Sequence, residues 1–375
     1  MALSPAPFPS PASDTPQTSR PIATRSGAAS KDRRCTPIDG SAYRPGLEYR
    51  KADLHLHSNY SYDVLNLPEL SPRALYEKAV ARGMGFFTLT DHETIRGVVA
   101  LRRELERDFG DEPPIPVING IEIKVRDPRI GHTIHVNILG LDQRQWLELA
   151  RRRHSVDDFL AFCRDESLYH AYNHPFWFER RERGRLEVIT ELIHQFPVIE
   201  LNAGRIPQLN RRTLDLSRRF GKEVVATSDS HTGRVAKAYT MAPGRTPEEF
   251  LQNIRAGVSR AVPRHAGFLE FMEEVGEAID LVFLKQKAFR PKKTFLREMP
   301  VARKIAVAAL ASEIVMRPKP LKLLLSATMH VVAGPPAYAF ILKQRRMDGR
   351  LEEAEQTLGM AGLWGAEPAP ARVNS

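Results

Sequence analysis

Residues 53–63 read Asp-Leu-His-Leu-His-Ser-Asn-Tyr-Ser-Tyr-Asp, and the rest of the chain can be understood from this stretch. Its first five residues alternate polar and apolar side chains, as in a strand whose successive side chains point to opposite faces. His55 and His57 would share one face, close enough to bind one ion, and the following turn would return Asp63 to the same place. Two imidazoles and a carboxylate suit zinc, manganese or iron. Two histidines on a half-exposed strand are the alternative interpretation.

Strands and helices alternate over residues 50–262, which predicts an α/β domain. Seven such units favour a parallel sheet closed into a (β/α) barrel. The expected strands span 53–57, 85–90, 115–123, 133–139, 168–173, 198–202 and 223–228, and the expected helices span 71–83, 94–109, 143–151, 155–166, 185–195, 207–220 and 246–257.

Polar residues that can bind metals fall near the carboxyl ends of these strands, which converge at one mouth of a barrel. Each has a more ordinary interpretation: Asp91 and Asp229 would cap local structure, and His174 would be a core histidine. His132 and His135 share a strand, and His135 is preferred because it is embedded in the apolar part. Taken together, the common placement favours a metal site made of His55, His57, His92, Glu122, His174, Asp229 and His231.

The composition indicates a globular chain with a basic segment. It has 375 residues, of which 42% are hydrophobic and 27% are charged. Cys35 and Cys163 form no Cys-x-x-Cys pair, which excludes a disulfide framework and argues against thiolate metal sites. Because no signal peptide is visible either, we expect a cytoplasmic protein. Residues 285–346 hold 14 Lys and Arg but two acidic residues, while the net charge of the chain is +10, so the remainder is slightly acidic.

Segments outside the barrel differ from it in composition. Residues 1–45 are rich in Pro, Ser, Thr and Ala and are predicted to be a disordered leader, and residues 366–375 a disordered tail. Residues 266–346 are predicted to form a basic helical extension. Helices are expected there at 268–288 and 302–316.

The run from Leu323 to Leu342 has no charged residue and approaches the length needed to cross a bilayer. Basic residues flank it, and Gly334-Pro335-Pro336 is expected to break it. A helical hairpin packed on the barrel, an interfacial anchor and a true span are the three interpretations. Packing, or peripheral anchoring to an anionic membrane surface at the inner face of the membrane, is favoured.

Five short motifs resemble those of the PHP superfamily, which is named after polymerase and histidinol phosphatase. They are Asp-Leu-His-Leu-His-Ser at 53–58, Thr-Asp-His at 90–92, Gly-Ile-Glu-Ile at 120–123, Asn-His-Pro at 173–175 and Ser-Asp-Ser-His at 228–231. The resemblance covers residues 50–260 and implies a distorted seven-stranded (β/α)7 TIM-like barrel with a trinuclear centre. The metals implied are Zn, Mn or Fe, with Mg also compatible.

Carried over by motif, the resemblance also implies three ligand sets. Glu122 would bridge two metals, and the third would be separate. The first metal would be held by His55, His57, Glu122 and Asp229, the second by Glu122, His135 and His174, and the third by Asp63, His92 and His231.

Clustered divalent ions favour hydrolysis of phosphate esters, because a hydroxide that bridges two metals is a nucleophile at neutral pH. Asp229 and His231 would lie near enough to assist proton transfer. Arg205, Arg96 and Arg234 are candidates for binding the substrate phosphate, with solvated surface arginines as the ordinary alternative.

The first hypothesis is therefore a metal-dependent phosphoesterase acting on phosphate mono- or diesters of a small molecule or nucleotide. A 5′→3′ exonuclease acting on short oligonucleotides, which some relatives of similar size resemble, is the second. The slightly acidic barrel argues against long nucleic acid, since binding phosphate chains requires clustered Lys and Arg. A non-catalytic, metal-stabilised module at a membrane is the third. The sequence carries no signal for an oligomeric state.

Overall fold

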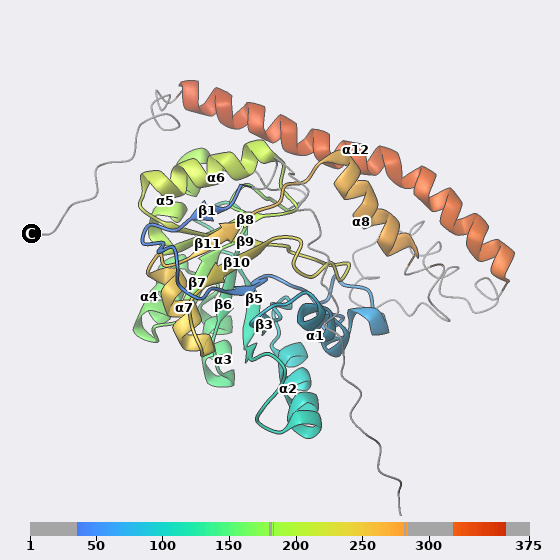
Figure 1. Ribbon diagram of the computed structural model, residues 1–375. Coiled ribbons are helices and arrows are strands. Elements are labelled where there is room, and N and C mark those ends of the chain that lie inside the picture. Colours follow the sequence, from blue (N-terminus) through green and yellow to red (C-terminus); the bar gives the residue numbers. More distant parts are fainter. Residues whose placement is uncertain (1–35, 180–181, 183, 281–282, 284–317, 358–375) are drawn as a thin grey trace, which may run out of the picture. The chain divides into compact units, whose positions relative to one another are not determined.

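The computed structural model describes residues 36–179, 182, 184–280, 283 and 318–357. An α/β unit is followed by two helices of the C-terminal extension (Figure 1). Most of the predicted leader, the helix predicted at 302–316 and the tail predicted at 366–375 lie outside the described residues.

A five-stranded sheet forms the centre of the α/β unit. Its strand β6 runs antiparallel to both neighbours, while the last three strands are parallel. The prediction of an all-parallel sheet is therefore wrong at β6. The loop 126–133 explains this, because a parallel crossover needs a dozen or more residues. In spatial order the strands are β5 (Gly120–Val125), β6 (Ile134–Leu139), β7 (Tyr169–Tyr172), β8 (Val198–Asn202) and β9 (Glu223–Thr227).

The reversal of β6 places His135 at the mouth of the unit. The register pairs His135 with Lys124, near the end of β5. Because antiparallel neighbours run in opposite directions, the first residues of β6 lie beside the last residues of β5 and β7. His135 thus reaches the same edge as the carboxyl ends of the parallel strands, although it stands at the start of its own strand.

The helices of the α/β unit begin where the sequence indicates. The Ser71 side chain caps α1 (Pro72–Ala81), and Asp142 and Gln145 form a capping box at the start of α3 (Gln143–Arg152). The remaining predicted helices also form, as α2 (Arg96–Phe109), α4 (Val156–Asp165), α5 (Leu186–Gln195), α6 (Pro207–Arg219) and α7 (Pro247–Arg255), together with a short 3₁₀ turn, η1 (Pro68–Leu70).

Two smaller sheets complete the unit, and they correct the prediction in two places. The strand predicted at 115–123 divides at Asn119. The leader predicted at 1–45 is wrong at its end, because β1 pairs there with β11. Strands this short carry too few residues for a period of two to be visible. The sheets are β3 (Phe87–Thr88) with β4 (Val117–Ile118), and β1 (Ile38–Asp39), β11 (Arg260–Val262), β10 (Tyr239–Ala242) and β2 (Arg50–Ala52).

The stretch 53–57 follows β2 and is not itself a regular strand, so that prediction is wrong in detail. It is nevertheless held between two neighbours. Thr90 N–H donates to Leu56 C=O at 2.8 Å, and His57 N–H donates to Ser230 C=O at 3.2 Å. The stretch is completely buried, histidines and leucines alike. Among the described residues, these single bonds link the sheets without forming one closed sheet.

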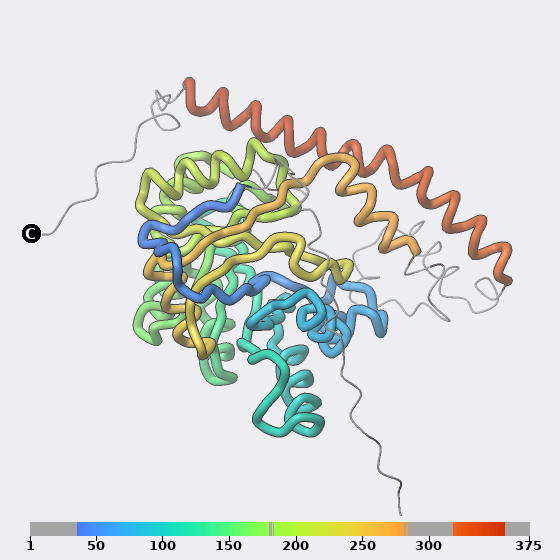
Figure 2. Tube along the Cα trace, in the orientation of Figure 1, coloured from blue at the N-terminus to red at the C-terminus, as the bar shows by residue number. Residues whose placement is uncertain are grey.

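The extension contains α8 (Phe268–Asp280) and α12 (Lys319–Thr357), which lie side by side (Figure 2). Helix α12 continues through Pro335 and Pro336, so the predicted break is wrong. Each proline removes one helical N–H. The carbonyls that lose these partners belong to Val331 and Val332, which are highly exposed, so water can satisfy them.

The C-terminal half of α12 packs on the α/β unit. Gln344 accepts the Ile206 N–H at 3.0 Å and donates to the Gly204 C=O at 3.1 Å. Arg212 of α6 forms an ion pair with Asp348. By length and composition only, α12 is long and apolar enough to cross a membrane. Of the apolar stretch that meets this criterion, 17% is buried in the protein.

Candidate metal centre

Four side chains converge from three separate segments. His55 Nε2 lies 3.0 Å from His57 Nε2, 3.2 Å from Glu122 Oε2 and 3.4 Å from Asp229 Oδ1. His57 Nε2 lies 3.4 Å from Glu122 Oε2 and 3.3 Å from Asp229 Oδ1. Ligands bonded to one tetrahedral zinc at its usual distances are about 3.3 Å apart. The distances between the two histidine nitrogens and from each of them to both carboxylates therefore fit ligands of a single ion.

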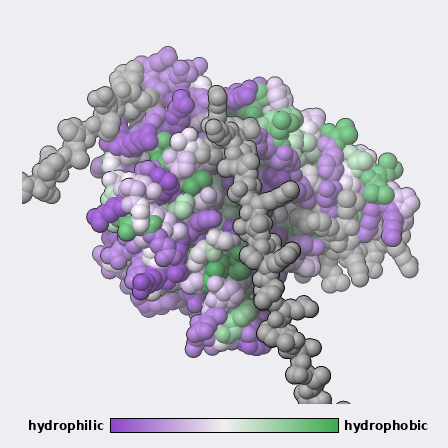
Figure 3. Space-filling view, viewed as in Figure 1, coloured by the Kyte–Doolittle hydropathy of each residue, from purple (hydrophilic) through white to green (hydrophobic). Residues whose placement is uncertain are grey.

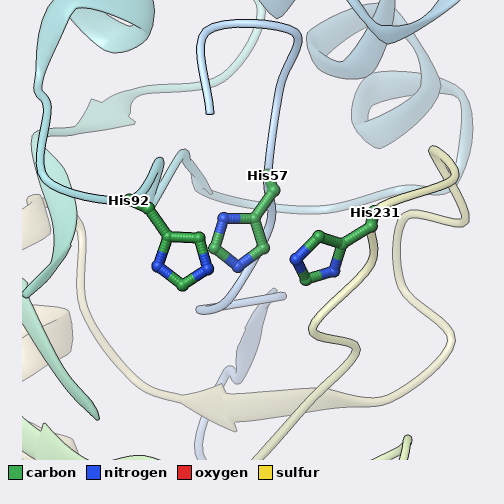
Figure 4. Close-up of side chains that lie close together, drawn as sticks. All are labelled: His57, His92 and His231. Atoms are coloured by element: carbon green, nitrogen blue, oxygen red, sulfur yellow. The ribbon is translucent and has the colours of Figure 1, made fainter. Parts of the chain in front are cut away.

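A second group surrounds His57 on its other side. The rings of His92 and His231 lie 4.7 and 4.3 Å from the His57 ring, which stands between them (Figure 4). Asp63 Oδ2 lies 3.1 Å from Nε2 of both His92 and His231. The turn that follows residues 53–57 thus brings Asp63 back to the histidine cluster, beside His92 and His231, as the sequence indicated.

The third group uses the other oxygen of Glu122. Its Oε1 lies 3.0 Å from His135 Nδ1 and 3.4 Å from His174 Nε2. His132, the alternative to His135, packs instead against Phe178, with ring centroids 5.1 Å apart. The structure therefore brings His135 into the cluster and leaves His132 outside it.

Backbone strain is concentrated at two of these positions. His174 and Asp229 have φ angles of 29° and 49°, a region that residues other than glycine seldom occupy. Hydrogen bonds hold both: His174 N–H donates to Glu200 Oε2 at 2.8 Å, and Asp229 N–H donates to His55 C=O at 3.0 Å. Strain of this kind persists where the surroundings enforce it, and it is common at functional sites.

Glu200 supports the cluster and was missed by the sequence reasoning. Its Oε1 lies 2.6 Å from His55 Nδ1, and this contact orients the ring so that Nε2 faces the cluster. Asn202 Nδ2 donates both to Glu200 and to Asp229. The signal was available: Glu200 is a carboxylate in an apolar strand, as Glu122 is, and a buried carboxylate needs partners.

The electrostatics keep two of the imidazoles in the neutral form that binds metal. Burial lowers the pKa of His57 to about 4, with repulsion from neighbouring histidines, and burial lowers the pKa of His135 to about 3. Both are therefore neutral at pH 7, as ligands must be. Burial also disfavours charge on His231, but the Asp63 carboxylate outweighs it and raises the pKa of His231 to about 10.

Unsatisfied atoms test whether a metal fits here. His57 Nδ1, His135 Nε2 and Glu122 Oε2 are buried without a hydrogen-bond partner among the described residues. Buried polar atoms are ordinarily paired, and a cation between Glu122 Oε2 and the nitrogens of His55 and His57 would satisfy this orphan oxygen. Imidazole nitrogens and carboxylate oxygens are the donors that zinc, manganese and iron accept.

The three candidate arginines fall in different places. Arg205 is 8% exposed and lines the cavity, and its Nε has no hydrogen-bond partner among the described residues. Arg96 is exposed at the start of α2 and does not line it. Arg234 forms an ion pair with Glu277 of α8, at 2.6 Å. Of the three arginines, Arg205 is the one placed to contact a substrate phosphate in the cavity.

The cluster opens into a cavity of about 550 Å³. This size is usual for a small-molecule site. Besides seven of the predicted ligands, Arg205 and residues of the extension, the lining includes four side chains that the sequence reasoning did not propose: Tyr62, Lys124, Trp177 and Lys237.

Two curated proteins are similar to part of this chain. An uncharacterised protein of Methanocaldococcus jannaschii is 37% identical over 86 residues, 21% of this chain and 47% of that protein. A 3′,5′-nucleoside bisphosphate phosphatase of Chromobacterium violaceum is 33% identical over 90 residues, 24% of this chain and 27% of that protein. The chain thus spans less than half of each curated relative.

Among solved structures, PsfC from Pseudomonas syringae aligns with a TM-score of 0.42 and 16% identity, covering 57% of this chain and 90% of that one. Residues 53–273 match the family described as PHP domain. This range contains every residue of the cluster and more than half of the chain. The protein therefore belongs to the PHP domain family.

Proposed function

We propose that the protein is a metal-dependent phosphoesterase that hydrolyses phosphate mono- or diesters of a small molecule or nucleotide. Glu122 carries this proposal, because its carboxylate lies within 3.4 Å of nitrogens from five histidines. The ligand sets support three divalent ions, of which zinc, manganese and iron suit the donors and magnesium is compatible. We also propose that the sheets and the stretch 53–57 form the wall of a distorted seven-stranded barrel.

Divalent ions at this site would lower the pKa of water and neutralise charge on phosphoryl oxygens. The chain itself supplies the other functions. Arg205 presents a guanidinium that can donate to two phosphate oxygens. Asp229 and His231 lie on the cavity wall, where a proton can pass to the leaving oxygen.

The name of the Chromobacterium relative makes nucleotides a reasonable first substrate. Long nucleic acid is disfavoured by the charges around the cavity. Lys124 is paired with Glu179 at 2.7 Å, and Lys237 with Glu274 at 2.8 Å. Neither lysine is therefore a free charge for binding a phosphate chain. The exonuclease and the non-catalytic module remain the alternatives that an assay would separate.

A metal-reconstituted assay tests the proposal. The purified chain, loaded in turn with Zn²⁺, Mn²⁺, Fe²⁺ or Mg²⁺, is given ethyl phosphate, a nucleoside 3′,5′-bisphosphate and a short oligonucleotide. We expect phosphate release that EDTA abolishes and metal restores. Release of mononucleotides from the oligonucleotide alone would favour the exonuclease. Stoichiometric metal without turnover of any ester would contradict the proposal and favour the non-catalytic module.

We further propose that α12 binds an anionic membrane surface. Apolar residues show on the part of the surface that α12 forms (Figure 3). On this helix Leu324 is 63% exposed and Val331 is 78% exposed. Lys319 precedes this face and basic residues follow it. Such a pattern suits a helix lying at the headgroups.

Vesicle flotation tests this association. The full chain should float with phosphatidylglycerol vesicles more than with phosphatidylcholine vesicles, because both apolar and ionic contacts contribute. Leu324→Asp with Val331→Asp should weaken binding by about tenfold or more. Leu147→Asp serves as the control, since Leu147 is 46% exposed on α3. Equal flotation of the double variant and the control would refute the role of α12.

A further inference from the structure

The cavity above the metal centre has two sides of different chemistry. One side carries the metal ligands and Arg205. The other side belongs to the extension, and the described residues that form it are almost all apolar. They are Phe271, Val275, Ala278 and Ile279 of α8, Phe283, and Met329 and Phe340 of α12.

This apolar wall is attached to the metal centre. The rings of Phe271 and Phe340 stack with centroids 4.7 Å apart and join α8 to α12. Glu274 of α8 pairs with Lys237 at 2.8 Å, and the Arg234–Glu277 pair ties the same helix to the loop that follows His231. The two ion pairs of α8 and the packing of α12 against it hold the apolar wall beside the predicted metal ligands.

The wall offers few groups to a polar substrate. Among the described residues of the extension that line the cavity, Glu274 is the polar one, and it is already bonded to Thr232 at 3.3 Å and paired with Lys237 at 2.8 Å. Sugar hydroxyls or base edges placed against the apolar residues would lose their water without gaining partners, which is costly. An apolar group would instead gain from leaving water.

We propose that the substrate is a phosphate monoester of an apolar alcohol, with an alkyl or prenyl chain against the extension and the phosphate at the metal centre. This inference rests on the proposed phosphoesterase function and specifies its substrate class. Water supplies the oxygen that forms the new bond to phosphorus, and the bond from phosphorus to the alkyl oxygen breaks. The leaving oxygen takes a proton, so the products are the alcohol and inorganic phosphate.

Chain length provides the test. The metal-loaded protein is assayed with ethyl, butyl and hexyl phosphate and with a nucleoside 3′,5′-bisphosphate. Each buried methylene should raise kcat/KM about threefold to fourfold, and hexyl phosphate should exceed ethyl phosphate by about 10²-fold. Equal kcat/KM along the series, or a preference for the bisphosphate, would overturn the inference while leaving the phosphoesterase in place.

Variants of the wall localise the effect. Phe340→Gln and Met329→Gln should each lower the ratio of kcat/KM for hexyl over ethyl phosphate by about threefold to tenfold. Leu269→Gln is the matched control, because Leu269 is 72% exposed on α8 and does not line the cavity. Thermal melts establish that each variant is folded. An unchanged ratio in both folded wall variants would refute the assignment.

Binding separates this inference from the catalytic proposal. Hexylphosphonate and ethylphosphonate cannot be hydrolysed, so calorimetry measures their affinities without turnover. If no ester is hydrolysed, the phosphoesterase proposal fails, but tighter binding of hexylphosphonate by about 10²-fold would still support the apolar wall. Equal affinities for the two phosphonates would refute it.

Discussion

Glu122→Gln should lower kcat/KM for any phosphate ester on the order of 10³-fold, because the change removes charge from the centre of the ligand cluster. Burial opposes ionisation of Glu122, but His92, His55 and His135 outweigh it and hold the pKa of this carboxyl well below its ordinary value. The group is thus a carboxylate at neutral pH. Glutamine has the same shape but is neutral, and it offers one oxygen where Glu122 offers two.

Metal content shows whether Glu122→Gln loses activity because it loses metal. Bound metal, determined by elemental analysis after dialysis, should fall in Glu122→Gln, and the stabilisation that metal gives in thermal melts should shrink. Glu93→Gln is the control, since Glu93 accepts from Lys124 N–H and Arg153 outside the cavity. Full metal content together with wild-type turnover in Glu122→Gln would show that this carboxylate does not bind the metals.

Much of the cluster could be predicted because its residues lie near strand ends. His92 follows β3, and Asp229 and His231 follow β9, and such ends converge in any sheet of parallel strands. Glu200 could have been found by the same reasoning that found Glu122. Lys124 and Trp177 could not, because a lysine in a strand and a tryptophan after a turn carry no signal of which side chain faces a cavity.

The errors have a physical cause as well. The direction of β6 depends on loop length, and the alternation of side chains is the same in either direction, so periodicity alone cannot give it. The pairing of β1 with β11 joins residues far apart in sequence. The contact of the extension with the cavity is also long-range. These are tertiary facts, and the composition of 266–346 indicated only that helices would form there.

Arg205→Met should lower kcat/KM by about 10²- to 10³-fold, the usual cost of removing one charged donor from a transition state. Burial lowers the pKa of Arg205, and the carboxylates of Asp229 and Glu200 oppose that shift, so the guanidinium remains charged at neutral pH. Its Nε has no hydrogen-bond partner among the described residues, which leaves this N–H able to donate to an anionic ligand. Arg205→Lys should recover part of the loss, because lysine keeps the charge without the planar fork.

Three readouts separate phosphate binding from a structural role of Arg205. Metal content should be unchanged in Arg205→Met, and the inhibition constant of inorganic phosphate should rise with the loss of kcat/KM. The melting temperature should hold or increase, because removing a buried charge without a full set of partners relieves a desolvation cost. Arg96→Met, at an exposed position, should match the wild type in all three. Wild-type phosphate inhibition in Arg205→Met would show that another group binds the phosphate, and a marked drop in melting temperature would show that Arg205 supports the fold instead.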